Sequence, residues 1–136
     1  MAFVHSMFKL QITANAMDRN KIIYWVATGI MCLIFTFSAV MYFANYETMS
    51  GFFTKFGFPT WIVYPLAVAK LLGVTAVLTK KSDMLKEWAY AGFFFDASLA
   101  FTSHTIAQDG GWMMSAIALV TLAISRYMDP KVFPKS

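Results

Sequence analysis

The sequence predicts an all-α integral membrane protein, a four-helix bundle with both termini in the cytoplasm. Three observations lead to this fold class: charged residues are scarce, four long runs are nearly free of charge, and the basic residues concentrate in alternate connections. Charged residues make up 13% of the chain, whereas they make up roughly a quarter of ordinary soluble domains. This deficit is typical of a chain that resides in lipid.

The four apolar runs cover residues 22–44, 61–79, 88–107 and 112–128. An α-helix rises about 1.5 Å per residue, so runs of this length cross a hydrocarbon core of roughly 30 Å, the last one only just. Helices of a soluble bundle would show polar faces at a period of about 3.6 residues. From Ile22 to Tyr46 there is no charge at all, so we expect each run to span the membrane.

Basic residues set the expected orientation. Nine precede the first run, lie between the second and third, or lie at the end of the fourth and beyond it: Lys9, Arg19, Lys21, Lys80, Lys81, Lys86, Arg126, Lys131 and Lys135. Only Lys55 falls in the other connections. Because cytoplasmic loops carry the excess of Lys and Arg, this bias predicts a multi-pass membrane protein with both termini and the middle connection in the cytoplasm. The expected location is the bacterial inner membrane. No basic cluster lies on a soluble element, so no nucleic-acid partner is expected.

The expected organisation is a peripheral N-terminal tail of residues 1–20, a transmembrane domain of residues 21–129 and a cytoplasmic tail of residues 130–136. The connection of residues 47–60 contains four phenylalanines, so it is expected to lie on the membrane surface or to fold over the mouth of the bundle. Pro65 predicts either a kink in the second helix or a role in shaping its first turn.

Lys70 and Asp96 are the full charges in the middle of the second and third runs, and each lies thirteen residues from Asp83. If these runs form a hairpin that turns near Asp83, both charges lie about 14 or 15 Å above the inner interface, near the midplane. Charges at this depth face the interior and find partners, so an ion pair is expected. The pair either locks the two helices in register or lines a cavity for a proton, an ion or a polar head group.

The third run carries a stripe of small residues at helical spacing, which predicts the face that packs into the bundle. The stripe and the aspartate within it consist of Ala89, Gly92, Asp96, Ala100, Ser103 and Ala107. Phenylalanines 93 to 95 are then expected to point mostly to lipid or to the flanks. On the second run, Gly73 offers a point of close approach one turn from Lys70. In the first run, Thr28, Thr36 and Ser38 are expected to bond to their own helix or to offer hydroxyls to the pocket.

His104 lies eight residues beyond Asp96, about 12 Å toward the outer face. It either belongs to a proton path with Asp96 or is a surface or hydrogen-bonded residue near a helix end. No metal site is expected, because the other histidine, His5, lies in the tail and no cysteine pair exists. Cys32 is the single cysteine, which excludes an internal disulfide.

Several stretches resemble DoxX-like proteins over about residues 20 to 128. They are Lys21-Ile-Ile-Tyr-Trp, Gly57-Phe-Pro, Ala69-Lys70-Leu-Leu-Gly73, Lys86-Glu-Trp-Ala-Tyr-Ala-Gly92-Phe-Phe-Phe and Ser103-His104. This resemblance implies a small four-helix membrane protein, so residues 21–129 become a DoxX-like transmembrane domain. The family takes its name from the quinone-linked subunit of thiosulfate oxidation. It supplies no catalytic assignment to carry onto Lys70, Glu87, Asp96 or His104.

We therefore expect Lys70, Asp96 and His104 to bind a ligand, with a quinone or another small amphipathic molecule as the candidate and no catalytic residue assigned. No intrinsic cofactor is expected, because no flavin, haem or metal motif is present, and any electron carrier would come from an oxidoreductase partner. Beyond the lipid bilayer, a homo-oligomer is a further candidate partner. The alternatives are a small proton-coupled transporter that uses the same residues, and a non-enzymatic membrane scaffold or chaperone in which the ion pair serves packing.

Overall fold

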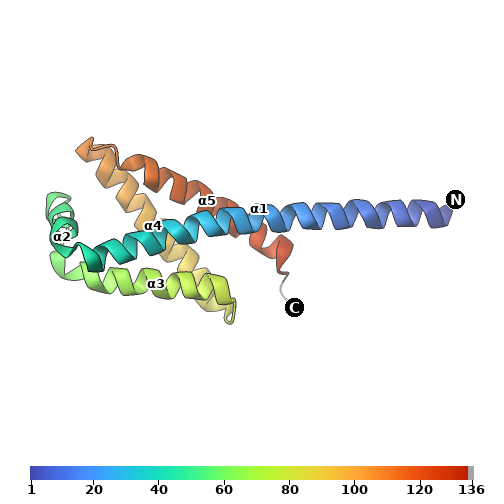
Figure 1. Cartoon of the computed structure of the whole chain (residues 1–136), viewed down its shortest axis with the longest axis horizontal. Helices are drawn as coiled ribbons and strands as arrows, with labels where there is room; N and C mark the ends of the chain where they lie inside the picture. Colours follow the sequence, from blue (N-terminus) through green and yellow to red (C-terminus); the bar gives the residue numbers. More distant parts are fainter. Residues whose placement is uncertain (135–136) are drawn as a thin grey trace.

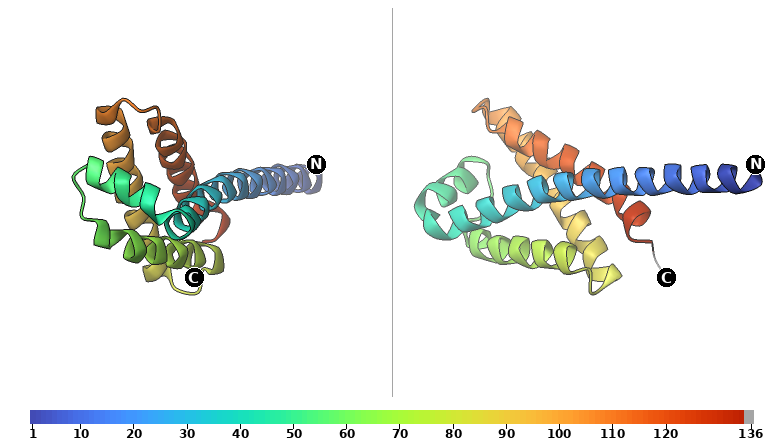
Figure 2. Two further views of the ribbon diagram at one scale, coloured as in Figure 1. Left: turned by 60° about the vertical axis from the view of Figure 1, so that its left-hand side comes forward. Right: turned by 45° about the vertical axis from the view of Figure 1, so that its right-hand side comes forward.

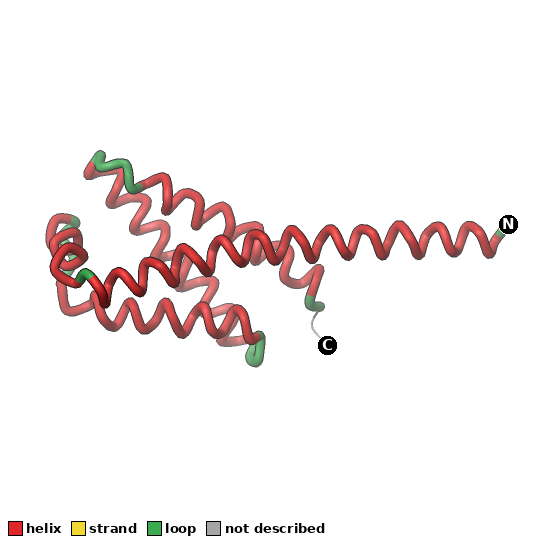
Figure 3. The backbone as a smooth tube through the Cα atoms, viewed as in Figure 1, coloured by secondary structure: helices red, strands yellow, loops and turns green. Residues whose placement is uncertain are grey.

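The computed structural model of the chain describes residues 1–134. The described residues form five α-helices and one short 3-10 helix, and they contain no strand (Figures 1 and 3). The elements are α1 (Ala2–Ala44), α2 (Tyr46–Lys55), η1 (Thr60–Ile62), α3 (Val63–Thr79), α4 (Asp83–Ala107) and α5 (Trp112–Val132). The all-helical class expected from the sequence is confirmed, with one α-helix more than the four expected.

The four long helices form a closed ring. α1 packs against α3 and α5, and α4 packs against the same two helices, so each long helix has two neighbours (Figure 2). The short α2 turns back from the C-terminal end of α1 and packs against α1, α3 and η1. We call the end of the ring that carries α2 and the α4–α5 turn its outer end, and the end that carries the α3–α4 turn its inner end. α2 is therefore an addition at one end of the ring rather than a fifth member of it.

α1 is much longer than the first apolar run. Residues 1–20, expected as a peripheral tail, continue the helix without a break and project from the ring toward the N-terminus (Figure 1). No proline occurs in α1 and its first glycine is Gly29, so nothing in the sequence interrupts the helix before the bundle. The buried face of α1 begins only at Tyr24. The projecting segment therefore lies outside the packed part of the molecule, as a helix.

In the connection between α1 and α3, particular residues account for the short helix α2 and for the turn that follows it. α2 has Glu47 in its first turn and Lys55 in its last, the arrangement that complements the helix dipole. Gly57, with φ of +84°, lets the chain reverse after α2. Pro65 lies in the first turn of α3, so the first-turn alternative is the correct one for this residue.

α3 and α4 are joined by a tight turn. Lys80 ends α3 with φ of +55°, and the Ser82 side chain caps α4 by accepting a hydrogen bond from the Leu85 backbone N–H at 3.3 Å. α5 continues to Val132 with Pro130 inside it, beyond the run that was expected to end at residue 128. Of the tail expected for residues 130–136, residues 135 and 136 lie outside the described residues.

The buried face of α4 differs from the expected small-residue stripe. Phe93 is 3% exposed and stacks on Phe35 of α1, with ring centroids 4.0 Å apart, whereas Gly92 is exposed. Phe94 and Phe95 point outward as expected. The expectation was wrong for Phe93 and Gly92 because Gly73 of α3 leaves room for the Phe93 ring, so a large residue is accommodated where small ones were sought.

Among the described residues, two helical segments are long and apolar enough to cross a membrane by length and composition. They are Ala2–Ala44, which is α1, and Thr60–Thr79, which joins η1 and α3. Large apolar side chains on the outside of α4 and α5 are exposed as well, among them Phe95, Leu99, Met113 and Val120. The exterior of the ring is therefore apolar on all four long helices.

Candidate functional site

A cavity of about 520 Å³ opens inside the outer half of the ring, beneath α2. All five α-helices line it, and most of its walls are aromatic or aliphatic. The aromatic lining consists of Phe35, Phe37, Tyr42, Phe52, Phe53, Phe56 and Phe58. The polar lining consists of Ser38, Lys70, Asp96, Ser103, His104 and Ser115. An apolar chamber with a few convergent polar groups is typical of small-molecule sites.

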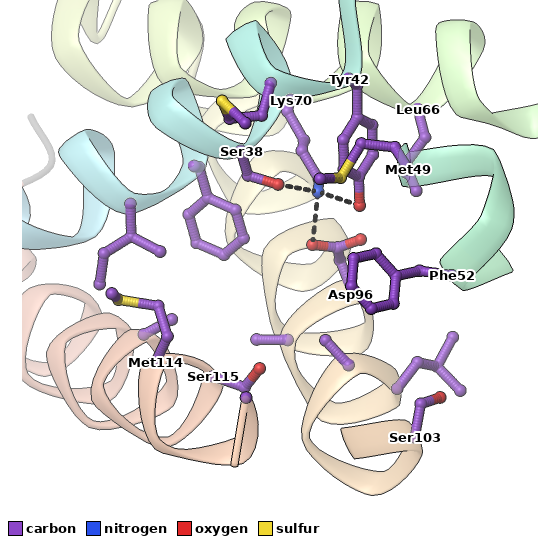
Figure 4. Close-up of a pocket in the computed structure, with 18 of the residues that line it drawn as sticks. Ser38, Tyr42, Met49, Phe52, Leu66, Lys70, Asp96, Ser103, Met114 and Ser115 are labelled. Atoms are coloured by element: carbon purple, nitrogen blue, oxygen red, sulfur yellow. Dashed lines mark hydrogen bonds and ion pairs between the residues drawn. The ribbon is translucent and has the colours of Figure 1, made fainter. Parts of the chain in front are cut away.

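Lys70 of α3 lies at the centre of the polar groups that line this cavity (Figure 4). Its Nζ donates to Ser38 Oγ at 2.8 Å and to Tyr42 OH at 3.0 Å, and it lies 3.4 Å from Asp96 Oδ2. The ammonium also lies 4.1 Å from the centroid of the Tyr42 ring. A lysine has three donor hydrogens, and three oxygens surround this one, so the 4% exposed Lys70 side chain is fully engaged within the protein.

Asp96 of α4 contacts Lys70 of α3, as their equal spacing from Asp83 predicts. The side chain is 18% exposed and points into the cavity beside Phe52 (Figure 4). The ion pair with Lys70 is the one polar contact of this carboxylate within residues 1–134. Asp96 is thus the charged group of the site that retains capacity for another partner.

His104 lies at the rim of the same cavity, near the outer end of α4. Its Nδ1 is 2.9 Å from both carboxylate oxygens of Asp109, and its ring meets Phe56, the residue that follows α2, edge-on at a centroid distance of 5.1 Å. Gly111 packs so closely under the imidazole that a Cβ there would approach Nδ1 to 2.5 Å. The histidine is therefore held in one orientation, between α2 and the α4–α5 turn.

Asp109 stabilises this arrangement electrostatically. The Gly111 backbone N–H donates to its Oδ1 at 2.9 Å, and this bond, followed by the contact with His104, holds the pKa of Asp109 below its ordinary value of 3.8. The carboxylate therefore stays ionised and accepts both hydrogen bonds. Of the two alternatives for His104, the hydrogen-bonded residue near a helix end describes its contacts, while its ring still lines the cavity.

A second polar centre, which was not expected, lies at the inner end of the ring. Asp129 of α5 is 2% exposed and accepts from Lys86 Nζ at 2.6 Å and from Lys80 Nζ at 3.2 Å. Burial alone would lower the pKa of Lys86, but the hydrogen bond and ion pair with Asp129, aided by Asp83, raise it above its ordinary value. The signal in the sequence is an acid, Asp129, at the end of the fourth apolar run.

Hydroxyl groups extend this inner centre toward the middle of the bundle. Ser125 Oγ lies 2.6 Å from Thr28 Oγ1 and 2.7 Å from Tyr90 OH, and all three side chains are buried. Lys80 also donates to the Tyr24 hydroxyl. Thr28 therefore joins the inner network, while Ser38, ten residues later on α1, joins the cavity. Both hydroxyls bind other helices.

An apolar layer separates the two polar regions. Tyr90 of this layer also belongs to the inner network through its hydroxyl, and Ala97 of this layer lines the cavity beside Asp96. Along each long helix the remaining residues of the layer fall between those of the inner centre and the polar residues of the cavity, and the stacked pair Phe35 and Phe93 lies within it. Its other members are Met31, Cys32, Val74, Val77, Tyr90, Ala97, Ala118 and Leu122. The polar groups of the site therefore face the outer half of the ring.

Within residues 1–134, no group of three His, Cys, Asp or Glu side chains is placed to hold a metal ion. The site consists instead of one buried ion pair, several hydroxyls and an aromatic wall, so its chemistry is that of hydrogen bonding and apolar contact. Of the residues expected to bind a ligand, Lys70 and Asp96 are in contact, and His104 lies apart from them at the rim.

A ring of helices with an apolar exterior and a polar pocket within defines a small helical membrane protein. The chain belongs to the DoxX-like family, a family of membrane proteins whose model matches residues 26–125. Comparison with curated proteins found no match, and comparison with solved structures found none either. The matched residues include the cavity, α2 and Ser125 of the inner network.

Proposed function

We propose that this chain is a four-span protein of the bacterial inner membrane that binds a small amphipathic molecule of the quinone type in the cavity at Asp96 and Lys70. The observation that carries the proposal is the cavity itself, because a charged pair at membrane depth borders an aromatic chamber instead of a packed core. A pair needed only to hold two helices together would not require such a space.

The shape of the cavity supports a ligand that arrives from the bilayer. Leu33 and Phe37 of α1 and Met114 of α5 line the cavity and are also exposed on the outside of the ring. α1 and α5 cross near the inner end and separate toward the outer end (Figures 1 and 2). A molecule dissolved in lipid would enter between these helices and place its polar head at the ion pair.

The membrane orientation in this proposal places both termini and the α3–α4 turn in the cytoplasm. Lys80, Lys86 and Arg126 cluster at the inner end, whereas Lys55 is the basic residue of the opposite connections. The cavity and its rim residue His104 then face the outer half of the membrane. A protein that binds a redox-active lipid here would act as the membrane subunit of an oxidoreductase, and a partner subunit would supply the electron carrier.

The proposal is tested by mass spectrometry of small molecules that remain with the protein after purification in gentle detergent. A quinone or another defined ligand is expected with the parent chain and is expected to be lost from Lys70→Met. Lys81→Met is the matched control, because Lys81 is exposed in the α3–α4 turn and lies outside the cavity. Ala100→Phe fills the cavity and keeps the ion pair, so it should lose the ligand even if Lys70→Met does not fold. Bulk lipid alone in every sample would refute the proposal.

A second candidate function is proton-coupled transport, which one observation favours. Polar centres lie on both sides of the apolar layer, with Lys70 and Asp96 above it and Lys80, Lys86 and Asp129 below it. A transporter would open the layer at Phe35 and Phe93 to connect the two. Proton flux in proteoliposomes that depends on Asp96 would favour this function over ligand binding alone.

A further inference from the structure

We propose that the cavity selects ligands by their hydrogen-bond donors, so that it binds the hydroquinone of a quinone couple more tightly than the quinone itself. The inference rests on the proposed function and specifies the chemistry of the same site. It follows from an account of which polar groups around the cavity are already satisfied and which are not.

The ammonium of Lys70 is satisfied. Its Nζ donates hydrogen bonds to Ser38 Oγ and Tyr42 OH, and its charge is paired with Asp96 Oδ2 at 3.4 Å, so each of its three hydrogens has an oxygen within reach. A quinone carbonyl can only accept hydrogen bonds, so to bind Lys70 it would have to displace one of these partners. Exchanging one buried hydrogen bond for another yields little affinity, because only the difference between the two contributes. Lys70 is therefore a poor donor to a ligand, although it is the cation of the site.

The carboxylate of Asp96 is not satisfied. It has two oxygens and about four lone-pair sites, and it receives one ion pair at 3.4 Å with no further hydrogen bond from the described residues. It is also the more exposed partner, at 18% against 4% for Lys70, and it faces the cavity (Figure 4). An O–H group of a ligand would find a charged acceptor there, and such hydrogen bonds are roughly twice as strong as neutral ones.

The remaining polar groups do not reverse this preference. The hydroxyl hydrogens of Tyr42 and Ser38 can serve a ligand acceptor, but those bonds are neutral and are open to a hydroquinone oxygen as well as to a quinone. A cationic amine is disfavoured, because Lys70 lies 3.4 Å from the same carboxylate and would repel it. A neutral aromatic alcohol fits both the charge of the site and its phenylalanine wall.

The test is anaerobic titration calorimetry of the full chain in detergent with three probes: durohydroquinone, duroquinone and the dimethyl ether of durohydroquinone. The probes share one methylated ring, and only the first has O–H donors. The charged hydrogen bond predicts that durohydroquinone binds roughly tenfold more tightly than either of the others. In Asp96→Asn the preference should fall to roughly one to one, because the charged acceptor is gone. Asp83→Asn, exposed at the inner end, should retain the preference.

The outcomes separate this inference from the function on which it rests. Equal binding of durohydroquinone and duroquinone to the parent chain would overturn donor selection and leave the proposed function standing. Binding of none of the three probes would overturn both. The ratio of the durohydroquinone and duroquinone affinities of the parent chain tests donor selection even if Asp96→Asn does not fold. A preference that survives in folded Asp96→Asn would show that another group selects the donor.

Discussion

At the scale of single residues, the Lys70 and Asp96 pair predicts unequal costs for removing one partner or both. Lys70→Met leaves the Asp96 carboxylate without its cation, and breaking a buried pair in this way costs about 3–5 kcal/mol of unfolding free energy. The double variant Lys70→Met with Asp96→Leu removes both charges and should lie within about 1 kcal/mol of the parent chain. Unfolding in detergent and denaturant measures each value.

The same double variant separates a binding role from a packing role. If the pair serves only to hold α3 and α4 together, the double variant keeps both its stability and every cellular phenotype. If the pair serves the cavity, stability is retained and the ligand is lost. A double variant that is as unstable as Lys70→Met would contradict the ion-pair account itself, because no unpaired charge remains in it.

Asp109 gives a prediction for acid. Its folded-state pKa lies below the ordinary 3.8, so its stabilising effect is fully present above that value and is lost as the pH falls through the lower folded pKa. Asp109→Asn should therefore unfold at a lower temperature than the parent chain near neutral pH, and the difference should shrink below about pH 3.8. Thermal unfolding across pH measures this. Asp18→Asn, on the exposed part of α1, is the control and should show no such difference.

Depth along a helix could be predicted from the sequence, but rotation and partners could not. Counting residues from Asp83 was enough to bring Lys70 and Asp96 to one height, because helical rise is constant. The contact of His104 with Asp109 depends on the turn at Gly110 and Gly111, which lets the chain fold back under the imidazole. Turns of this kind depend on dihedral angles that an apolar pattern does not encode.

At the scale of elements, the packing of α3 on α4 predicts opposite effects for two identical substitutions. A Cβ on Gly73 would lie 2.7 Å from Cζ of Phe93, so Gly73→Ala should cost about 1–3 kcal/mol through overpacking. Gly92 of α4 has nothing within 4 Å of its would-be Cβ, so Gly92→Ala should be neutral or stabilise by up to about 1 kcal/mol. Denaturant unfolding of the two variants measures the difference.

A rescue experiment isolates the contact. Phe93→Leu combined with Gly73→Ala removes the ring that the new methyl group meets, so the pair should be less destabilising than the sum of the single changes. If the losses of stability of the two single variants simply add in the double variant, the Phe93 ring does not restrict the side chain at position 73. The rotational position of α4 would then have to be closer to the small-residue stripe expected from the sequence.

The elements themselves were predictable to different degrees. Long runs nearly free of charge predicted the packed parts of all four long helices, because apolar length is a strong signal. The extension of α1 to Ala2 was not expected, since polar residues at its start were interpreted as the end of a span and not as the continuation of a helix. α2 was expected only as an apolar connection and not as a helix. Its phenylalanines indicate that the segment lies against the bundle or the membrane, but they do not indicate its secondary structure.

At the scale of the whole molecule, the two ends of the ring of helices differ in chemistry. The inner end gathers Lys80, Lys86 and Asp129, and the outer end carries α2, His104 and the cavity. The apolar layer around Phe35 and Phe93 keeps them apart. One half of the ring is therefore packed and the other encloses the cavity, and the proposed orientation decides which compartment each half faces.

Cysteine labelling in intact cells tests that orientation. Lys55→Cys at the end of α2 and Gln108→Cys in the α4–α5 turn should react with a membrane-impermeant maleimide, because both positions are expected outside. Ser6→Cys and Lys81→Cys should react only after the membrane is disrupted. The parent chain is the background control, since its single cysteine, Cys32, is buried. Labelling of Lys81→Cys in intact cells would reverse the orientation, and protection of Gln108→Cys while Lys55→Cys reacts would mean that α3 and α4 do not both cross the membrane.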